Sequence, residues 1–264
     1  MPPAYVKPYV KRGKTDAADA EAICEVVTRP TMRFVAIKTP EQQAVLMLHK
    51  TRDLLVRQRT GLINALRAHL AEYGIVSSKG PGGVTALIKI LHETQERLPI
   101  HARSALHVIG AQLRALASEI DRLEVQILAW HRTDATSRRL ATIPGIGPIT
   151  ASAIAAAVPD ANVFRSGRQF AAWLGLTPRP NSSGGKEKLG GISKQGDGYL
   201  RRLLVVGATA VMRMVRKKAS AHPWAAQLLT RKPVKFATVA LANKTARVAW
   251  AVMARKEVYA ATAA

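Results

Sequence analysis

An apolar repeat with alternating steps of three and four residues constrains the fold of this chain more than any other feature. Its members are Leu106, Ile109, Leu113, Leu116, Ile120, Leu123, Ile127 and Trp130. Such a stripe lies along one side of a long helix and has to be covered by another helix. The cover is either the stretch 41–72, folded back antiparallel, or the same stripe of a second copy in a dimer.

Residues 41–72 themselves have the pattern of a long helix. The leucines that we expect on one face are Leu48, Leu55, Leu62, Leu66 and Leu70. Arginines occupy other faces, and Tyr73-Gly74 is expected to end the helix. A Gly- and Pro-rich loop and a short helix near 84–91 follow. We therefore assign residues 39–137 to a helical coiled-coil segment.

The segments on either side differ in character. Residues 1–38 contain one helix near 16–28 and an apolar run ending at Ile37 that could form one or two strands, which is too little for a domain. Small residues and basic side chains dominate after residue 137. The helices predicted there cover 148–157, 166–173, 197–218, 222–230 and 235–254. The predicted fold class is mainly α, with an N-terminal remnant of an α/β domain (1–38) and a helical C-terminal domain (138–264).

Charge restricts the partners of this chain. It has 40 Lys and Arg against 17 Asp and Glu, a formal net charge of +23, and that excess repels itself unless a polyanion such as nucleic acid binds. Between 181 and 256 sixteen cations face two acids. The alternative is a coiled-coil assembly protein whose charge serves solubility. The first residues form no apolar signal, and no apolar run approaches the ~18 residues of a membrane span, so we expect a cytoplasmic protein without a membrane partner.

The sequence Ile143-Pro144-Gly145-Ile146-Gly147-Pro148 is typical of the turn in a helix-hairpin-helix element. Glycines allow such a turn to approach a phosphate, toward which the N–H groups of the next helix point. We predict that Gly145 and Gly147 contact nucleic acid in this way. The alternative is a tight turn between helices with no ligand.

The loop Asn181-Ser182-Ser183-Gly184-Gly185-Lys186 precedes a basic helix that contains Arg201 and Arg202. Its two hydroxyls are candidates for a nucleophile, and Lys186, Lys188 and Lys194 could hold a phosphate beside them. Arg201 and Arg202 are expected to extend the nucleic-acid-binding surface. The alternative is a loop that binds phosphate without reacting.

Asp16 and Asp19 lie three residues apart on the first turn of the helix near 16–28. One face of that turn would carry both carboxylates, which are the ligands that Mg²⁺ prefers. Two carboxylates rarely suffice, so other acids would have to join them. The alternative is helix capping, with Thr15 or Asp16 as the N-cap.

Four aromatic residues lie among the basic residues of the C-terminal part: Tyr199, Trp224, Phe236 and Trp250. They could stack on bases or belong to the core. Tyr199 and Tyr259 could also be nucleophiles of a tyrosine-type recombinase, but no constellation of Arg and His precedes either in the sequence.

An ordered set of motifs resembles one known family. The motifs are Tyr5-Val6-Lys7-Pro8-Tyr9, Lys14-Thr15-Asp16-Ala17-Ala18-Asp19-Ala20, the turn from Ile143 to Thr150, Gly175-Leu176-Thr177-Pro178 with Ser182-Ser183-Gly184, and Gly191-Ile192-Ser193-Lys194 through Arg201-Arg202-Leu203-Leu204. They are similar to those of the insertion-sequence transposases of the one-hundred-and-ten type, DEDD transposases described as bridge-RNA-guided recombinases. The resemblance spans nearly the whole chain.

The resemblance implies a function and a set of site residues. Residues 1–38 would be the end of a RuvC-like domain of the RNase H type, with Asp16 and Asp19 as the last two of four acids that bind Mg²⁺. Ser182, or else Ser183, would attack a DNA phosphate and form a phosphoserine link. DNA, a structured guide RNA and further copies of the chain would be the partners, in a prokaryotic cytoplasm.

One departure from the family pattern affects the expected activity. The first Asp and the Glu of the family would precede the segment that corresponds to Met1. We therefore expect a truncated copy, or a reading frame that begins at an internal methionine. In either case the chain should bind DNA or RNA but perform no strand transfer by itself. The alternative function is that of a non-catalytic, helical nucleic-acid-binding protein.

Overall fold

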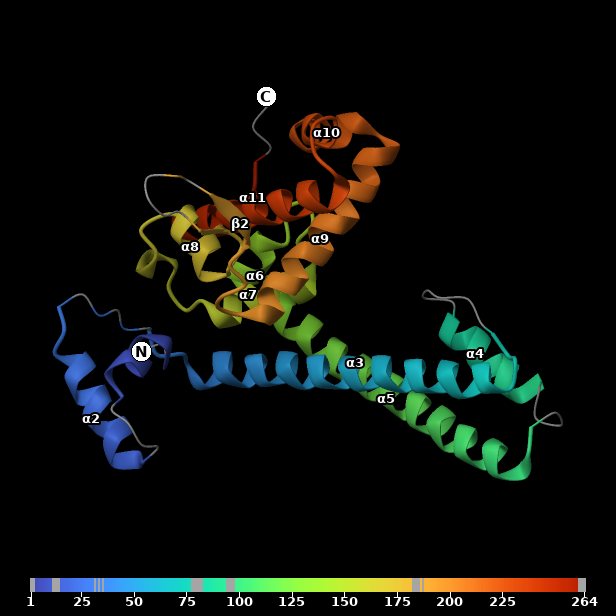
Figure 1. Cartoon of the computed structure of the whole chain (residues 1–264). Helices are drawn as coiled ribbons and strands as arrows, with labels where there is room; N and C mark the ends of the chain where they lie inside the picture. Colours follow the sequence, from blue (N-terminus) through green and yellow to red (C-terminus); the bar gives the residue numbers. More distant parts are fainter. Residues whose placement is uncertain are drawn as a thin grey trace.

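The computed structural model describes residues 3–10, 15–30, 32, 34, 36–76, 83–93, 98–181, 186 and 188–260. Two long helices lie side by side and carry a bundle of shorter helices near one end, while the N-terminal segment lies apart from that bundle (Figure 1). The described residues are mainly helical, which confirms the predicted class at that level.

The two long helices, α3 (Pro40–Glu72) and α5 (Ile100–Thr133), form an antiparallel pair within the chain. At one end Trp130 Nε1 donates to Glu41 Oε1 at 3.0 Å. At the other end Leu66 and Leu70 pack in one cluster with Leu106. α4 (Gly83–Glu93) lies beside that distal end. We call α3, α4 and α5 the stalk. The sequence left open whether α3 or a second copy of the chain covers the apolar stripe of α5. In the structure α3 covers it.

The leucines of α3 indicated its buried face at the distal end, where Leu66 and Leu70 are buried, but over the first half of the helix the buried face lies one residue away from them. Leu48 and Leu55 are only half-buried, whereas Val45 and His49 are fully buried. The helix presents polar side chains to its partner over this stretch: Arg52 donates through Nε to Glu124 Oε1 of α5 at 2.7 Å. Leucine periodicity alone missed this face because a histidine and an arginine occupy it.

The N-terminal segment is helical where the structure describes it. It contains α1 (Pro3–Val6), the 3-10 helix η1 (Lys7–Tyr9) and α2 (Asp16–Val27). Thr15 caps α2, since its hydroxyl accepts from the backbone N–H of Ala18 at 3.2 Å. The described residues of the apolar run that ends at Ile37 form no strand, so the strand expected there is not found among them.

The C-terminal part is a bundle of helices with one short hairpin; we call α6 to α11 the C-terminal bundle. Its elements are α6 (Ala135–Leu140), α7 (Pro148–Ala157), η3 (Ala161–Val163), α8 (Gly167–Trp173), β1 (Pro178–Pro180), β2 (Leu189–Ile192), α9 (Gly198–Lys217), η4 (Ala219–Ala221), α10 (Pro223–Leu229) and α11 (Val234–Arg255). The five predicted helices are confirmed, while the hairpin was missed.

The core of the C-terminal bundle surrounds α7. Seven consecutive residues of α7, Thr150 to Ala156, are buried. Most of them are small, so α3, α5, α6 and α9 can all pack against this helix. Larger side chains such as Phe170 and Leu204 fill the space around it. α7 therefore joins the stalk to the C-terminal bundle. Within the residues described, no helix is long and apolar enough to cross a membrane.

Candidate functional site

The serine loop is flanked by the two strands of an antiparallel hairpin, which we call the serine hairpin. Pro178 lies opposite Ile192, and Pro180 lies opposite Leu189. Asn181 N–H donates to Lys188 O at 2.8 Å and extends the pairing toward the loop. The predicted residues Ser182 and Ser183 lie outside the described residues, so what the structure describes is the frame on either side of them.

The base of the serine hairpin is fixed to the C-terminal bundle by backbone contacts. Ser193 N–H donates to Thr177 O at 2.8 Å. Asn243 of α11 donates through Nδ2 to Leu176 O at 3.1 Å. Gly196 has φ +73°, and a Cβ added to it would overlap the carbonyl oxygen of Trp173. Only glycine allows the chain after β2 to lie this close to the end of α8.

Arg201 holds this same base together. Its Nη1 donates to Leu174 O at 2.9 Å and to Gln195 O at 2.7 Å. One guanidinium thus joins the end of α8 to the segment that leads from β2 into α9. The structure therefore assigns Arg201 a structural partner within the protein, while its predicted contact with nucleic acid stays a prediction.

We expect Arg201→Ala to lower the free energy of unfolding by about 1.5 kcal/mol, because two carbonyl oxygens lose a charged donor. Urea titration of the purified chain measures the change. Arg213→Ala is the matched control, since Arg213 is an exposed arginine of the same helix. A variant with unchanged stability but a shallower salt dependence of DNA binding would instead make Arg201 a phosphate contact.

The other predicted cations differ in their surroundings. Lys186, Lys188 and Lys194 are exposed, and Lys194 adopts a left-handed backbone with φ 57°. Arg202 forms an ion pair with Asp53 of α3, and its guanidinium carbon lies 5.5 Å from the centre of the Tyr199 ring. The exposed Lys186 and Lys194 lie on either side of β2, whereas Arg202 is engaged with the stalk.

The turn between α6 and α7 contains the predicted helix-hairpin-helix glycines, and the structure separates them. Gly145 has φ +87°, and a Cβ added to it would lie 3.0 Å from Val211 Cγ2 and 3.1 Å from Gly207 O, both of α9. Gly147 is exposed at the N-cap of α7 and has open space around its Cα. Gly145 thus packs on α9, while Gly147 has open space around it, and the predicted contacts of both with nucleic acid stay predictions.

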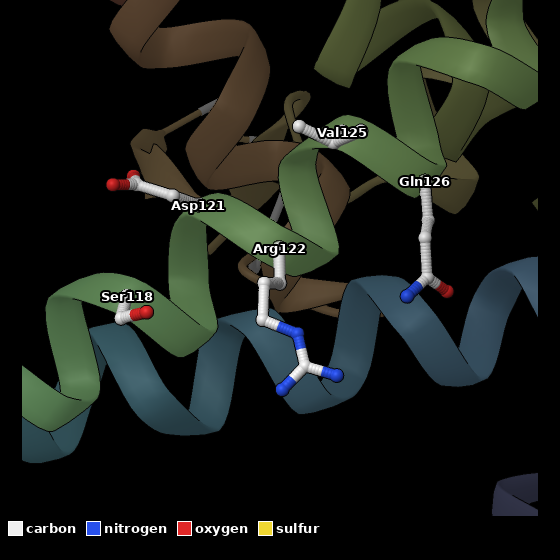
Figure 2. A pocket seen from close by; sticks show the side chains of 5 residues that line it. All are labelled: Ser118, Asp121, Arg122, Val125 and Gln126. Carbon is white, nitrogen blue, oxygen red and sulfur yellow. The ribbon is translucent and has the colours of Figure 1, made fainter.

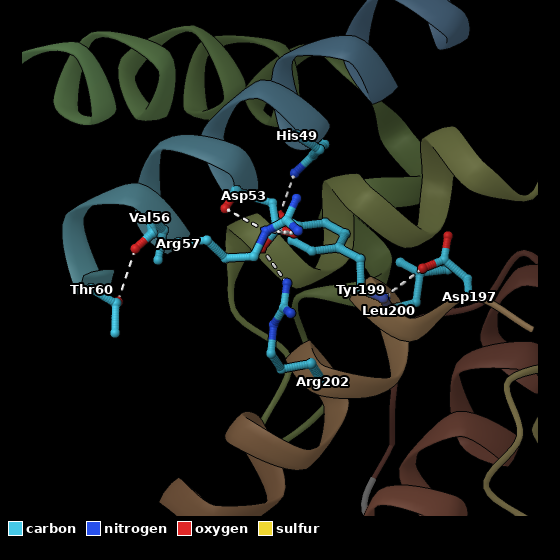
Figure 3. A network of polar contacts seen from close by, with 9 residues as sticks. All are labelled: His49, Asp53, Val56, Arg57, Thr60, Asp197, Tyr199, Leu200 and Arg202. Atoms are coloured by element: carbon cyan, nitrogen blue, oxygen red, sulfur yellow. Dashed lines mark hydrogen bonds and ion pairs between the residues drawn. The ribbon is translucent and has the colours of Figure 1, made fainter. Parts of the chain in front are cut away.

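A buried histidine that the sequence analysis missed joins the stalk to this region. His49 Nδ1 lies 3.1 Å from Tyr199 Oη of α9, and its Nε2 lies 3.1 Å from Ser152 Oγ of α7. Figure 3 shows His49 and Asp53 of α3 facing Tyr199 and Arg202 of α9. One side chain of the stalk therefore bridges two helices of the C-terminal bundle, in phase with the buried Val45.

The chemistry of this joint favours a neutral imidazole. Burial, followed by the nearby Arg52 charge, lowers the pKa of His49 to about 4. Burial also raises the pKa of Tyr199. A hollow of about 240 Å³ lies beside these residues, lined also by Asp53 and Asp197. Tyr199 has arginine and histidine neighbours in the structure, although no such cluster precedes it in the sequence. Arg52 and Arg57 come from α3, as does His49, and Arg202 comes from α9.

A second hollow, of about 410 Å³, lies along α5 (Figure 2). Its lining consists of Ser118, Asp121, Arg122, Val125 and Gln126. All five belong to one helix, and Arg122 pairs with the neighbouring Glu119 at 3.0 Å. It is an open helix face, and we assign no ligand to it.

Asp16 and Asp19 are both exposed on the first turn of α2. Thr15, not Asp16, is the N-cap of that helix. In the part of the chain that the structure describes, no three His, Cys, Asp or Glu side chains gather to hold a metal. α2 also lies apart from β2 in Figure 1. The carboxylate pair and the serine hairpin are therefore not brought together within the described chain.

Known proteins match this chain over nearly its whole length. Residues 137–223 match the model described as the transposase IS116/IS110/IS902 family, and residues 2–75 match a model of the DEDD transposase domain of the IS110 type. A Sinorhizobium fredii protein named as a transposase is 49% identical over 259 residues, covering 97% of this chain and 67% of the relative. The "Probable family 20 transposase" of Pseudomonas aeruginosa is 49% identical over 260 residues, covering 97% and 77%.

A third relative, the transposase for insertion sequence element IS1111A of Coxiella burnetii, is 41% identical over 259 residues, covering 97% of this chain and 71% of the relative. Both family models thus fall on the segments where the serine hairpin and the Asp16–Asp19 pair lie. The chain belongs to the IS116/IS110/IS902 family of transposases.

Proposed function

We propose that this transposase exchanges DNA strands with Ser182 as the nucleophile. The observation that carries the proposal is the rigid base of the serine hairpin. Arg201, Asn243 and the close backbone approach at Gly196 all fix the strands that flank Ser182. A nucleophile has to be held in line with its target, and a fixed frame is what this requires. Lys186, Lys188 and Lys194 add the charge that draws a phosphodiester to it.

The step forms one bond and breaks another. Ser182 Oγ attacks the phosphorus, the Oγ–P bond forms, and the bond from phosphorus to one deoxyribose oxygen breaks. The hydroxyl proton leaves to solvent or a base, and the departing alkoxide takes up a proton to become a free hydroxyl. The reverse attack by another strand's hydroxyl restores the serine and joins the new strand. No energy source is consumed, since one phosphodiester replaces another.

Asp16 and Asp19 are proposed metal ligands. Both side chains are exposed, and Thr15 performs the capping, so both carboxylates are free to bind a cation. The described residues bring no third carboxylate to them, and they therefore do not form a complete Mg²⁺ site. We derive no step through the metal, and propose that strand transfer requires further acids to join this pair.

Further parts of the proposal rest on the family. A structured guide RNA, homo-oligomeric assembly and a prokaryotic cytoplasmic location agree with the resemblance, and the cationic excess of +23 suits both DNA and RNA. Gly147 at the start of α7 is a proposed phosphate contact, because its surroundings are open.

The test of Ser182 is the formation of a covalent protein–DNA adduct. The probe is a labelled duplex carrying the joined ends of the insertion element, with sulfur replacing the bridging oxygen at the junction. Thiolate is a better leaving group than alkoxide, so attack requires less help from a metal. Ser182→Ala is expected to abolish the adduct that resists denaturing electrophoresis, while Ser183→Ala, its matched neighbour, retains it.

Other outcomes of this experiment are equally clear. Loss of the adduct in Ser183→Ala alone would transfer the role to Ser183. An adduct that survives both changes would overturn the serine mechanism, and an absent adduct with retained DNA binding would favour the non-catalytic alternative. With unmodified DNA and Mg²⁺ we expect binding without strand transfer, and robust strand transfer would contradict the proposed need for further acids.

A further inference from the structure

The structure separates the four aromatic residues of the basic C-terminal part into two classes. Three are engaged within the protein. Tyr199 Oη contacts His49, and Trp250 Nε1 donates to Ala161 O at 3.0 Å. Lys244 Nζ lies 4.3 Å from the centre of the Trp224 ring, which it covers. These three rings have partners already, so they are poor candidates for stacking on a base.

Phe236 is the exception. It lies on the first turn of α11, and 71% of its surface is exposed. In the described part of the chain its ring contacts no other aromatic ring and no cation. Leaving a phenylalanine in water forgoes the free energy that burying its ring would give. A single exposed ring is common on protein surfaces, so the residues around Phe236 decide what it could bind.

The surroundings of Phe236 are strongly basic. Arg231, Lys232 and Lys235 are all exposed within five residues of it, and none of the described ion pairs involves them. The backbone N–H groups of Arg231 and Lys232 both donate to Leu228 O, which fixes the turn after α10. We call residues 231–236 the basic turn. It lies within a run from 198 to 256 that contains thirteen Lys or Arg and no acid.

We propose that the basic turn binds an unpaired segment of nucleic acid, with a base stacked on Phe236 and phosphates held by Arg231, Lys232 and Lys235. An aromatic ring among cations is the combination that recognises single strands without regard to sequence. In a duplex each base face is covered by its neighbours, so a ring at this surface finds a partner only where bases are unpaired. Strand exchange and a structured RNA both present such segments.

Charge also argues against a second copy of the chain as the occupant. Two basic turns meeting across a twofold axis would bring six cations together around the two rings, and that repulsion opposes the contact. A polyanion has the complementary charge. The inference rests on the nucleic-acid binding of the proposed function but not on the serine chemistry, because the basic turn and β2 occupy different parts of the C-terminal bundle (Figure 1).

The test compares single-stranded with duplex probes on the whole 264-residue chain. Fluorescence anisotropy with a labelled mixed-sequence oligonucleotide gives the affinity. Phe236→Ala is expected to weaken binding to the single strand about 10-fold, in line with the loss of one stacked base, and binding to the duplex less than about twofold. Phe236→Trp should restore single-strand binding. Phe34→Ala is the matched control, since Phe34 is an exposed phenylalanine outside the C-terminal bundle.

The cations are tested separately by salt dependence. Replacing Lys232 and Lys235 by alanine is expected to reduce the slope of log affinity against log salt by roughly 1.4 for the single strand, which corresponds to two lost phosphate contacts. DNA and RNA probes of the same sequence show which strand the basic turn prefers. These affinities are measured without any covalent adduct, so a failure of the serine mechanism is distinguishable from a failure of this inference.

Three results would overturn the inference. One is an unchanged single-strand affinity of Phe236→Ala, and another is an equal loss for single strand and duplex. The third is a change in oligomeric state of Phe236→Ala in sedimentation, which would make Phe236 a contact between copies.

Discussion

Replacing Gly207 with alanine is expected to lower the free energy of unfolding by about 3 kcal/mol, although alanine is the better helix former. Gly207 lies within α9, where a Cβ would overlap the carbonyl oxygen of Gly145 in the turn between α6 and α7. The nearest obstacle is backbone, which cannot rotate aside as a flexible side chain can. Either α9 or the turn has to move, and both belong to the core that surrounds α7.

Gly61→Ala provides the control for this change. Gly61 is an exposed glycine within α3, and a Cβ added there would meet nothing within 4 Å. Alanine at position 61 should therefore stabilise the chain by about 0.5–1 kcal/mol, through helix propensity and a less flexible unfolded state. Urea unfolding of both variants measures the change in the free energy of unfolding, which should be negative for Gly207→Ala and positive for Gly61→Ala. Equal effects at the two positions would show that α9 and the turn do not pack as closely as described.

The contact between Gly207 and Gly145 also explains why the sequence left two interpretations of the turn that contains Gly145 and Gly147 open, a phosphate-binding turn and a tight turn without a ligand. Gly145 and Gly147 belong to one pattern, yet Gly145 is required by its packing on α9 and Gly147 has open space around it. A short motif specifies a turn, but it carries no information on which distant helix covers which residue. Gly207, sixty-two positions after Gly145, shows no pattern of its own in the sequence.

The buried face of a helix could be predicted from the sequence where an apolar stripe packs against other apolar side chains. The stripe of α5 predicted its buried residues because Leu106, Leu113, Ile120 and Ile127 all face the core. The same reasoning held at the distal end of α3, where Leu66 and Leu70 are buried, but failed over its first half, where His49 and Arg52 take positions that a leucine would occupy in a simple coiled coil. The face of a helix is set by what covers it, and here the cover is Glu124, Ser152 and Tyr199.

The serine hairpin was missed for a related reason. Its strands are three and four residues long, and β1 is Pro178-Arg179-Pro180, a composition that argues against a strand. Long-range contacts hold it: Arg201, Asn243 and the end of α8 fix its base. The candidate nucleophile Ser182 was identified through the family motif. Such a motif identifies a residue but does not predict the hairpin that flanks it.

Stability is expected to fall by about 2 kcal/mol between pH 7 and pH 5 because of His49. The pKa of His49 in the folded chain is about 4, below its ordinary value of 6.5. As the pH falls below 6.5, the unfolded chain takes up a proton at this position that the folded chain refuses until about pH 4. Proton uptake therefore favours the unfolded state across this window, and the contribution is constant above it.

The neighbours of His49 explain why the folded joint rejects the proton. Arg52 on α3 repels it, Arg202 on α9 lies beside Tyr199, and burial removes water that would solvate an imidazolium. Urea titrations of the wild type and of His49→Gln at both pH values isolate the effect, since the other acids and bases are common to the two proteins. The variant is expected to lose about 2 kcal/mol less on acidification than the wild type.

The exposed His69 of α3 supplies the control for removing a histidine, because it lies far along the same helix from the joint. His69→Gln should keep the pH dependence of the wild type. If His49→Gln keeps it as well, His49 is protonated in the folded chain and the joint with Tyr199 and Ser152 is looser than described. If only His49→Gln loses it, acid loosens the attachment of the stalk to α7 and α9, the two helices that begin next to the Gly147 turn and the base of the serine hairpin.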